Sequence, residues 1–307
     1  MTMRIVAVLA AALVLAGCGS AVQRHPTPPR PAPKAQVAWA GDYQTGDFSQ
    51  WPGHQFDAGD ARVGTGLTPA APPAPFRYVA QYTIAAGSDV VAHGVRSEVL
   101  RQPVESDAAP GVDDYWRWYV YFPSSFHHPP NQSDMLLSDW HTTNSGCAVP
   151  VVFDTQDGDS VYVRIRGGAT QLQSWGSPAS VPPLDPRFGG RTFIDTTHAC
   201  ETQTDRRYTL IPHIQRDHWY QITLHVKWSS DPSAGAFEAW VDGCRRTPAG
   251  DHLATLLEPR WGATYLKQGE YDPAGWQPGW PASTVDYTGT ASYRSYADVW
   301  PSAPTCG

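Results

Sequence analysis

Short runs of aromatic and β-branched residues recur along this chain, and each is bounded by Gly, Pro, Asn or Asp. Such side chains favour the pleated surface of a sheet, whereas convincing helical periodicity is rare here. Strands without a repeat of fixed period predict an all-β fold of two packed antiparallel sheets, a β-sandwich or jelly roll of the concanavalin-A-like type. The expected strands are 76–84, 94–102, 115–122, 135–141, 151–154, 161–166, 219–228, 236–241, 265–271 and 295–300.

Three segments refine this prediction. The segment 115–122 is apolar on both faces except at Arg117, which predicts a strand in the middle of the sandwich. Residues 219–243 predict a hairpin that ends in a tight Asp-Gly turn. We also expect a short helix within 251–263 and long, loop-rich connections over 167–213.

The amino-terminal residues predict export. Residues 1–17 carry one charge, Arg4, and then an apolar run that is too short for a comfortable transmembrane span, which predicts a secretory signal. The run ends in the sequence LAGC at Cys18, which resembles the bacterial lipobox and implies a lipid anchor on that cysteine. The alternative is an ordinary exported protein that is cut nearby, with Cys18 lost or incidental.

The rest of the chain divides into a tether and one domain. Residues 18–36 are rich in proline and predict an extended, semi-rigid linker. Residues 37–307 fit one large β domain. The predicted location is therefore the bacterial cell envelope, on the outer side of the cytoplasmic membrane, or the medium outside the cell.

Cysteine count and charge restrict the function classes. An even number of cysteines remains without Cys18, which predicts disulfides in an exported chain, and no pair has the close spacing of a zinc site. Three connectivities are open, and the one that closes two separate loops joins Cys147 to Cys200 and Cys244 to Cys306. The formal net charge is −7, so we expect no nucleic-acid partner, and a polyanionic substrate would need a local basic cleft.

Three separated segments each place two chemically active side chains on one face of an expected strand, because side chains alternate between faces. The pairs are Arg96 with Glu98, Asp139 with His141, and Lys267 with Tyr271. Taken singly, each pair has an ordinary structural explanation. Together, on neighbouring strands of one sheet, they predict a binding or catalytic site for an anionic sugar chain.

In this order the three segments resemble the motifs of the β-jelly-roll polysaccharide lyases, which include alginate, glucuronan and heparin-lyase-I-like families. The matching sequences are RSE at 96–98, DWH at 139–141 and YLKQGEY at 265–271. The tryptophan-rich hairpin at 219–243 and the sequence GDFSQW at 46–51 are more similar to the heparin-lyase-I and glucuronan-lyase branch. The resemblance extends over about residues 41–300.

Lyases of this kind cleave a uronate-linked glycoside by β-elimination. Removal of the proton next to the carboxylate creates a dianionic, enolate-like intermediate, so a cation or hydrogen-bond donor must hold that carboxylate. A base takes the proton, and an acid protonates the departing oxygen. The resemblance implies an enzyme that acts on an anionic polysaccharide without a metal or other cofactor in catalysis. We expect a monomer. The sequence leaves open whether a structural calcium ion is bound.

The resemblance also implies a role for each residue. Arg96 would hold the uronate, His141 would serve as base or as a second neutralising group, and Tyr271 would protonate the leaving oxygen. Lys267 would bind a neighbouring acidic sugar, and Glu98 would orient Arg96 through a bidentate pair. The division of base and acid roles between His141 and Tyr271 stays open.

The sequence departs from the family pattern at Asp139, where these lyases often have glutamine. A carboxylate there repels the substrate unless it is protonated or paired with a cation such as Arg96 or Lys267. It would otherwise point away and orient the neighbouring histidine, with Gln44 or Asn144 supplying the neutralising donor.

A second departure concerns Arg101, which lies three residues after Glu98 rather than two. In a regular strand this spacing turns its side chain to the opposite face. We therefore leave Arg101 out of the predicted site.

Two other functions fit parts of the pattern. A non-catalytic, lectin-like lipoprotein of the same fold would keep the cleft but lose its chemistry through Asp139, and the thirteen tryptophans suit sugar binding in either case. A glycoside hydrolase on a similar sandwich needs two carboxylates at a defined separation, and no strand carries a closely spaced acidic motif.

Overall fold

The computed structural model describes residues 36–91, 94–101, 111–131, 133–143, 149–156, 159–167, 191–195, 203–229, 234–249, 264–300 and 306. Contacts divide the chain into Met1–Pro33 and Lys34–Gly307. The predicted signal segment, Cys18 and all but the last residue of the predicted tether lie outside the described residues. The same is true of the predicted helix within 251–263.

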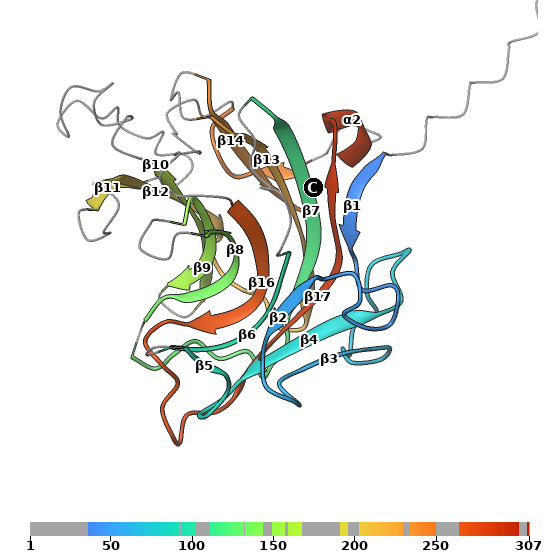
Figure 1. The fold of residues 1–307 in the computed structure, drawn as a ribbon, viewed down its shortest axis with the longest axis vertical. Helices are drawn as coiled ribbons and strands as arrows, with labels where there is room; N and C mark the ends of the chain where they lie inside the picture. Colours follow the sequence, from blue (N-terminus) through green and yellow to red (C-terminus); the bar gives the residue numbers. More distant parts are fainter. Residues whose placement is uncertain are drawn as a thin grey trace, which may run out of the picture. The chain divides into compact units, whose positions relative to one another are not determined.

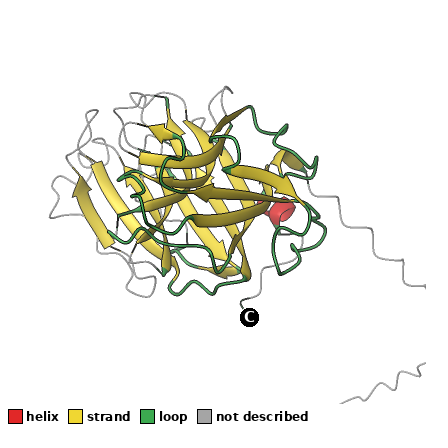
Figure 2. Ribbon diagram, turned by 90° about the horizontal axis from the view of Figure 1, so that it is seen from below, coloured by secondary structure: helices red, strands yellow, loops and turns green. Residues whose placement is uncertain are grey.

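Residues 34–307 form two antiparallel sheets, which confirms the predicted all-β sandwich of jelly-roll type (Figures 1 and 2). The eight-stranded sheet has the order β15 (Cys244–Arg245), β14 (Ala236–Val241), β13 (His218–Lys227), β7 (Asp113–Phe122), β17 (Ser283–Tyr293), β4 (Val79–Ile84) and β3 (Ala61–Gly64), with β1 (Val37–Gly41) also paired to β17. The nine-stranded sheet has the order β11 (Arg191–Asp195), β12 (Gln203–Ile211), β10 (Ser160–Gly167), β9 (Val151–Gln156), β8 (Met135–Thr142), β16 (Thr264–Asp272), β6 (Gly94–Leu100) and β2 (Gly53–Gln55), with β5 (Val90–Val91) paired to β6.

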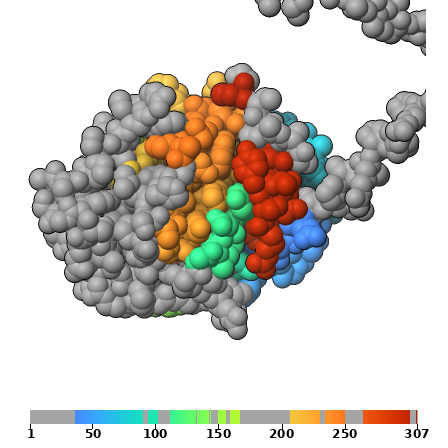
Figure 3. Space-filling model, turned by 90° about the horizontal axis from the view of Figure 1, so that it is seen from above, coloured from blue at the N-terminus to red at the C-terminus, as the bar shows by residue number. Residues whose placement is uncertain are grey.

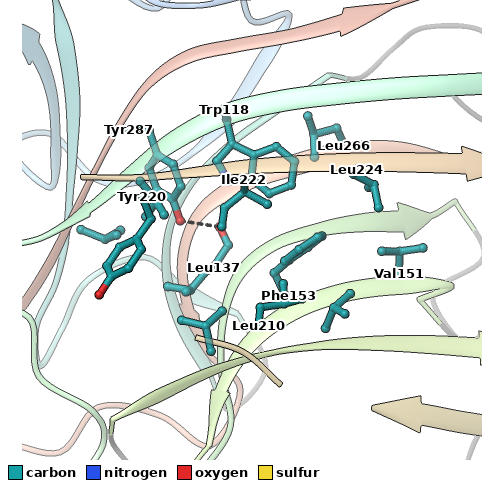
Figure 4. Close-up of a cluster of buried hydrophobic side chains, with 14 of the residues drawn as sticks. Trp118, Leu137, Val151, Phe153, Leu210, Tyr220, Ile222, Leu224, Leu266 and Tyr287 are labelled. Atoms are coloured by element: carbon teal, nitrogen blue, oxygen red, sulfur yellow. Dashed lines mark hydrogen bonds between the residues drawn. The ribbon is translucent and has the colours of Figure 1, made fainter. Parts of the chain in front are cut away.

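The hydrophobic core lies between the two sheets. Alternate residues of β13, such as Ile222 and Leu224, point inward and meet Leu137 and Phe153 of the nine-stranded sheet (Figure 4). The period-two burial follows directly from strand geometry. The aromatic strand 115–122 lies within β7, between β13 and β17, so its predicted central place is confirmed.

Three predictions about secondary structure were wrong. Residues 283–293 form the long central strand β17. The sequence did not indicate it, because polar residues and the small residues Gly289 and Ala291 interrupt its apolar pattern. Residues 191–195 and 203–211, expected in loops, form β11 and β12. The expected strand at 295–300 is instead the short helix α2 (Tyr296–Val299), which Ser295 caps by accepting a hydrogen bond from the Asp298 backbone nitrogen.

The hairpin and one disulfide agree with the sequence analysis. Strands β13 and β14 pair in antiparallel register, and Asp242 and Gly243 follow with φ values of 50° and 78°, as a tight turn between β14 and β15 requires. Cys244 is bonded to Cys306, which confirms that half of the predicted pairing. Cys147 and Cys200 lie outside the described residues.

One face of the molecule displays the outer side of the eight-stranded sheet (Figure 3). On it, orange, green and red segments lie side by side in the order in which β13, β7 and β17 pair. His225 of β13 lies between two carboxylates there, with Nε2 2.8 Å from Asp113 and Nδ1 3.1 Å from Glu238. Burial lowers the pKa of His225, but the hydrogen bonds to Glu238 and Asp113 outweigh it and raise the pKa overall.

Among the described residues, no helix has the length and apolar character needed to cross a membrane.

Candidate active site

Six of the predicted site residues lie on the outer face of the nine-stranded sheet, where β8, β16 and β6 lie side by side: Arg96, Glu98, Asp139, His141, Lys267 and Tyr271. These strands curve so that their hollow side faces away from the other sheet (Figure 1). Leu266 of β16 is buried in the core between the sheets. Its neighbours Tyr265 and Lys267 therefore point to the hollow side, and so does Tyr271 further along the strand.

An ion pair between Lys267 and Glu98 occupies the centre of this face. The Lys267 Nζ donates a hydrogen bond to Glu98 Oε2 at 2.6 Å, and the two side chains are only 3% and 2% exposed. The residue opposite Glu98 in the ladder is Gly269, which has no side chain to separate the two. Burial lowers the pKa of Lys267, but Glu98 and Asp139 outweigh it and raise the pKa, so this cation stays charged.

This contact corrects two predicted roles. Glu98 was expected to orient Arg96, but its carboxylate pairs with Lys267 instead. Lys267 was expected to bind a neighbouring acidic sugar, yet its ammonium group is buried below the surface, where it pairs with Glu98. The sequence could not show this diagonal contact, because it depends on the register of β16 against β6.

Asp139 lies directly opposite Lys267, in the pairing of β8 with β16. Its side chain is 1% exposed, and no described residue donates a hydrogen bond to its Oδ1 atom. Burial raises the pKa of Asp139 to about 7, against the opposing effect of Lys267 and with a further rise from Glu98. The carboxyl lies on the hollow side, beneath the surface, and its raised pKa favours the protonated form compared with an ordinary aspartate.

Arg96 and Tyr271 form one end of the site. They are direct partners in the pairing of β16 with β6. Arg96 Nε lies 3.1 Å from Asp89 Oδ2, an ion pair that fixes the guanidinium. Within the described part of the chain its other two nitrogens have no hydrogen bond, which leaves a fork suited to a carboxylate.

His141 and Tyr265 form the other end. They are direct partners in the pairing of β16 with β8, and the Tyr265 hydroxyl lies 3.3 Å from His141 Nδ1. The two rings are 5.5 Å apart, so the tyrosine holds the imidazole from the side. Tyr265 was not among the predicted site residues, although strand alternation alone already placed it on the same face as Lys267 and Tyr271.

Strand β16 is irregular around Gly269, between Lys267 and Tyr271. A straight strand would separate the Cα atoms of Tyr265 and Tyr271 by about 20 Å, and those of Lys267 and Tyr271 by about 13 Å. The register against β8 shifts between Gln268 and Tyr271, and Lys267 Nζ lies only 5.8 Å from the centre of the Tyr271 ring. The side chains of Lys267 and Tyr271 therefore lie close together on the hollow face.

Both tyrosines stay protonated near neutral pH. Burial raises the pKa of Tyr271, with a further rise from Glu98, and this outweighs the lowering by Lys267 and Arg96. Burial also raises the pKa of Tyr265. Each phenol is therefore better suited to donate a proton than to remove one.

Polar groups in the core fix β16 from behind. Gln268 accepts hydrogen bonds from Tyr43 and Thr290, both at 2.8 Å, and Glu270 accepts one from Ser283 at 2.6 Å. Two of these partners, Thr290 and Ser283, lie on β17 of the other sheet. The strand that carries Lys267 and both tyrosines is thus tied across the sandwich rather than only along its edges.

Gly269 has a special place in this strand. Its φ is +150°, and a Cβ atom there would lie 2.1 Å from the backbone oxygen of Ser97 and 2.8 Å from the Glu98 Cα. Only glycine fits this close approach of β16 to β6. The glycine of the YLKQGEY motif is therefore required by packing as well as by the bend.

Gln44, predicted as an alternative neutralising donor, lies away from this face. Its side-chain nitrogen donates to the backbone oxygens of Asp42 and Tyr78, and its oxygen accepts from the backbone nitrogens of Arg77 and Tyr78. These bonds hold the side chain of Gln44 in the loop after β1. The prediction that Gln44 supplies a neutralising donor to the site was therefore wrong. Asn144, the other alternative, lies outside the described residues.

Arg101 was left out of the predicted site on spacing alone. Its guanidinium lies over the rings of Trp39 and Trp116, at 4.7 and 5.8 Å from their centres. Trp116 belongs to the core between the sheets. The side chain therefore points away from the site, as the strand spacing predicted.

Among the described residues, no group of three or more His, Cys, Asp or Glu side chains is arranged to hold a metal ion.

Comparisons with known proteins identify the family and agree with the fold. The family model described as polysaccharide lyase matches residues 43–296. Among solved structures, the chain is similar to an endo-β-1,4-glucuronan lyase from the fungus Trichoderma reesei, with 13% identity, a TM-score of 0.58 and coverage of 83% of this chain and 95% of that chain. An alginate lyase from Pseudomonas aeruginosa also matches, with 16% identity, a TM-score of 0.44 and coverage of 70% and 82%. No curated protein matches the chain.

The family match covers most of the described domain, including all three predicted motif segments. The resemblance noted from the sequence is thereby confirmed, and the protein is a lyase enzyme. The chain belongs to the polysaccharide lyase family.

Proposed function

We propose that this lyase cleaves a uronic-acid-containing polysaccharide by β-elimination, with the hollow face of β8, β16 and β6 as its active site. The observation that carries the proposal is the position of Arg96 directly opposite Tyr271. A carboxylate anchor and a protonated phenol thus occupy neighbouring places on one surface, which is what protonation of a leaving oxygen beside a uronate needs.

Arg96 binds the carboxylate of the sugar that loses its proton. Its Nε atom is already paired with Asp89, so the two terminal nitrogens face the substrate without a further cost of ordering. As negative charge moves onto that carboxylate, the charge-assisted hydrogen bonds strengthen. Lys267, 5.8 Å from the centre of the Tyr271 ring, neutralises the buried carboxylate of Glu98 beneath this surface.

Tyr271 donates its proton to the departing oxygen, and His141 removes the proton from the carbon next to the carboxylate. The raised pKa of Tyr271 keeps the phenol protonated for this step. Tyr265, at 3.3 Å from His141 Nδ1, holds the imidazole in place on this face. Tyr265 is a positioning residue in this scheme.

The tyrosines provide a matched pair for testing these roles. Tyr271→Phe removes the proton donor and leaves the ring, so turnover should fall by about 100-fold or more while polysaccharide binding persists. Tyr265→Phe removes the hydrogen bond to His141 and should cost less, about 10-fold. If Tyr265→Phe abolishes turnover and Tyr271→Phe does not, the acid is Tyr265 and our assignment is wrong.

Activity itself is tested by following the ultraviolet absorbance of unsaturated uronate. The purified domain is incubated separately with glucuronan, alginate, heparin, heparan sulfate and hyaluronan. A rise with at least one of them supports the proposal. If the absorbance rises with none of them, although the protein is shown to be folded, a uronate substrate is contradicted.

We further propose that the enzyme is a monomer held at the outer side of a bacterial cytoplasmic membrane by a lipid on Cys18. The support is the apolar segment 1–17 and its LAGC ending. Metabolic labelling with a fatty acid should mark the wild-type chain and not Cys18→Ser. Label in both chains, or in neither, contradicts the lipid anchor, and light scattering of the purified domain tests the monomer.

A further inference from the structure

The buried charges at the centre of the site do not balance. Among the described residues, Lys267 is the cation that forms an ion pair with Glu98, at 2.6 Å. Asp139, opposite Lys267 in the ladder and 1% exposed, adds a second carboxyl to the same buried group. If both carboxyls were ionised, these three side chains would carry one net negative charge directly beneath the place where a uronate binds.

Neighbouring cations do not relieve this charge. Arg164 on β10 lies on the same face, but Asp134 contacts its guanidinium at 3.0 Å and Asp154 forms a second ion pair with it. Arg166, further along β10, lowers the pKa of Asp139, yet burial of the carboxyl outweighs both arginines. A buried carboxylate whose oxygen receives no hydrogen bond is costly in its charged form, so the carboxyl takes up a proton instead.

The other groups that face Asp139 are known from the strand pairings. They are His141 on its own strand, Tyr265, Lys267 and Tyr271 on β16, Arg96 and Glu98 on β6, Asp154 on β9, and Arg164 and Arg166 on β10. Of the carboxylates in this set, Glu98 and Asp154 each have a cationic partner. Asp139 is the carboxyl of this set that forms no ion pair or hydrogen bond with a described residue, and its Oδ1 atom is buried.

We propose that Asp139 keeps its proton while the enzyme works, and that its neutral carboxyl holds the centre of the active site at zero net charge for the substrate's carboxylate. This inference rests on the proposed function and deepens it, because it assigns a role to the one position that departs from the family's glutamine. A protonated carboxyl is neutral, carries one donor and closely matches an amide in shape. Ionisation of Asp139 places a negative charge beside the substrate's carboxylate and weakens both binding and the dianionic intermediate.

The test is the pH dependence of kcat/KM in the wild-type protein and in Asp139→Asn. The wild type should lose activity as the pH rises above about 7, by about tenfold for each further pH unit, because only the protonated fraction is active. The asparagine variant cannot ionise there and should keep its activity over the same range, with less than about a threefold fall. KM should account for part of the wild-type loss, since a charged Asp139 also repels the bound uronate.

Asp286 provides a matched control on the other sheet. Its carboxyl is also buried, its pKa is raised to about 7 by burial, and it accepts a hydrogen bond from Gln81 at 2.9 Å. It lies on β17 of the other sheet, and its hydrogen-bond partner Gln81 lies on β4. Asp286→Asn should therefore show the same alkaline loss of activity as the wild type.

Two outcomes overturn the proposal. In the first, Asp139→Asn loses activity at alkaline pH just as the wild type does. In the second, the variant loses turnover equally at every pH, which is the result expected if a charged Asp139 served to orient His141.

A direct titration separates this proposal from the proposed function. In protein labelled with ¹³C at aspartate carboxyls, the resonance that is missing from Asp139→Asn should titrate near neutral pH. A midpoint in the ordinary acidic range of aspartate overturns the proposal whatever the activity. If the resonance titrates near neutral pH but no polysaccharide is cleaved, the protonation of Asp139 is supported and the uronate-lyase function is contradicted.

Discussion

The buried ion pair between Lys267 and Glu98 yields the sharpest stability prediction. Replacing Lys267 by Met keeps the length and apolar volume of the side chain but removes its charge. Glu98 and Asp139 would then lie buried without a cation in the group of three. Removing one partner of a buried pair costs about 3–5 kcal/mol, because the remaining charge stays out of water.

The expected loss is measurable by thermal and urea unfolding of the purified domain. For a domain of this size each kcal/mol lowers Tm by about 2–4 °C, so Lys267→Met should lower it by about 6–20 °C. The loss should be smaller at acidic pH, where both carboxyls carry protons in the variant. Lys227→Met on β13 is the matched control, since the structure shows no ion pair for Lys227 among the described residues, and it should change stability by less than about 1 kcal/mol.

The double variant Glu98→Gln with Lys267→Met tests the reason for the loss. If uncompensated charge is the cause, removing the carboxylate as well should restore most of the stability, because neutral side chains of similar size tolerate burial. A single Lys267→Met variant that loses less than about 1 kcal/mol would refute the reasoning. So would a double variant no more stable than the single one.

Further predictions concern the bend, the proton donor, the outer face and the disulfide. Gly269→Ala should unfold the domain or abolish activity, since its Cβ would meet the Ser97 oxygen at 2.1 Å; circular dichroism and the absorbance assay check this, and a normal Tm with normal activity would argue against the bend. Tyr271→Phe should remove turnover while isothermal calorimetry still detects polysaccharide binding, and loss of binding as well would give the hydroxyl a different role. The raised pKa of His225 means that its charge adds stability below pH about 6.5 and that this is lost as pH rises through the folded-state pKa, so His225→Gln should destabilise the domain more at pH about 5.5 than at pH about 8.5. Cys244→Ala opens a link across 62 residues and should cost up to about 4 kcal/mol in urea unfolding, whereas an unchanged midpoint would show that the bond is dispensable.

The fold class was predictable because alternation and aromatic runs are local properties of strands. The strand 113–122 has a strong apolar pattern and was found almost to the residue. Strand β17 was missed because its inward residues include hydroxyl and glycine positions, whose burial depends on partners in the opposite sheet such as Gln268. Polar groups that satisfy one another across a core leave no hydrophobic period in the sequence.

The site was predictable as a set of residues on one face, but not as a set of contacts. The motif spacing placed Arg96, Glu98 and Lys267 together correctly. It could not show that Glu98 pairs with Lys267, because that depends on the register of β6 against β16 and on the missing side chain of Gly269. Asp89, which lies directly before β5 and pairs with Arg96, had no signal at all in the sequence.

The central claim is that this enzyme breaks its substrate by elimination on the hollow face of the nine-stranded sheet. Mass spectrometry of the products tests it most directly, once a cleaved polysaccharide is found. The account predicts oligosaccharides that are lighter by one water than the hydrolysis products, formed by the wild type and not by Tyr271→Phe. Products that all have the hydrolysis mass, with no fragment lighter by one water, would contradict it, and so would products formed equally well without the Tyr271 hydroxyl.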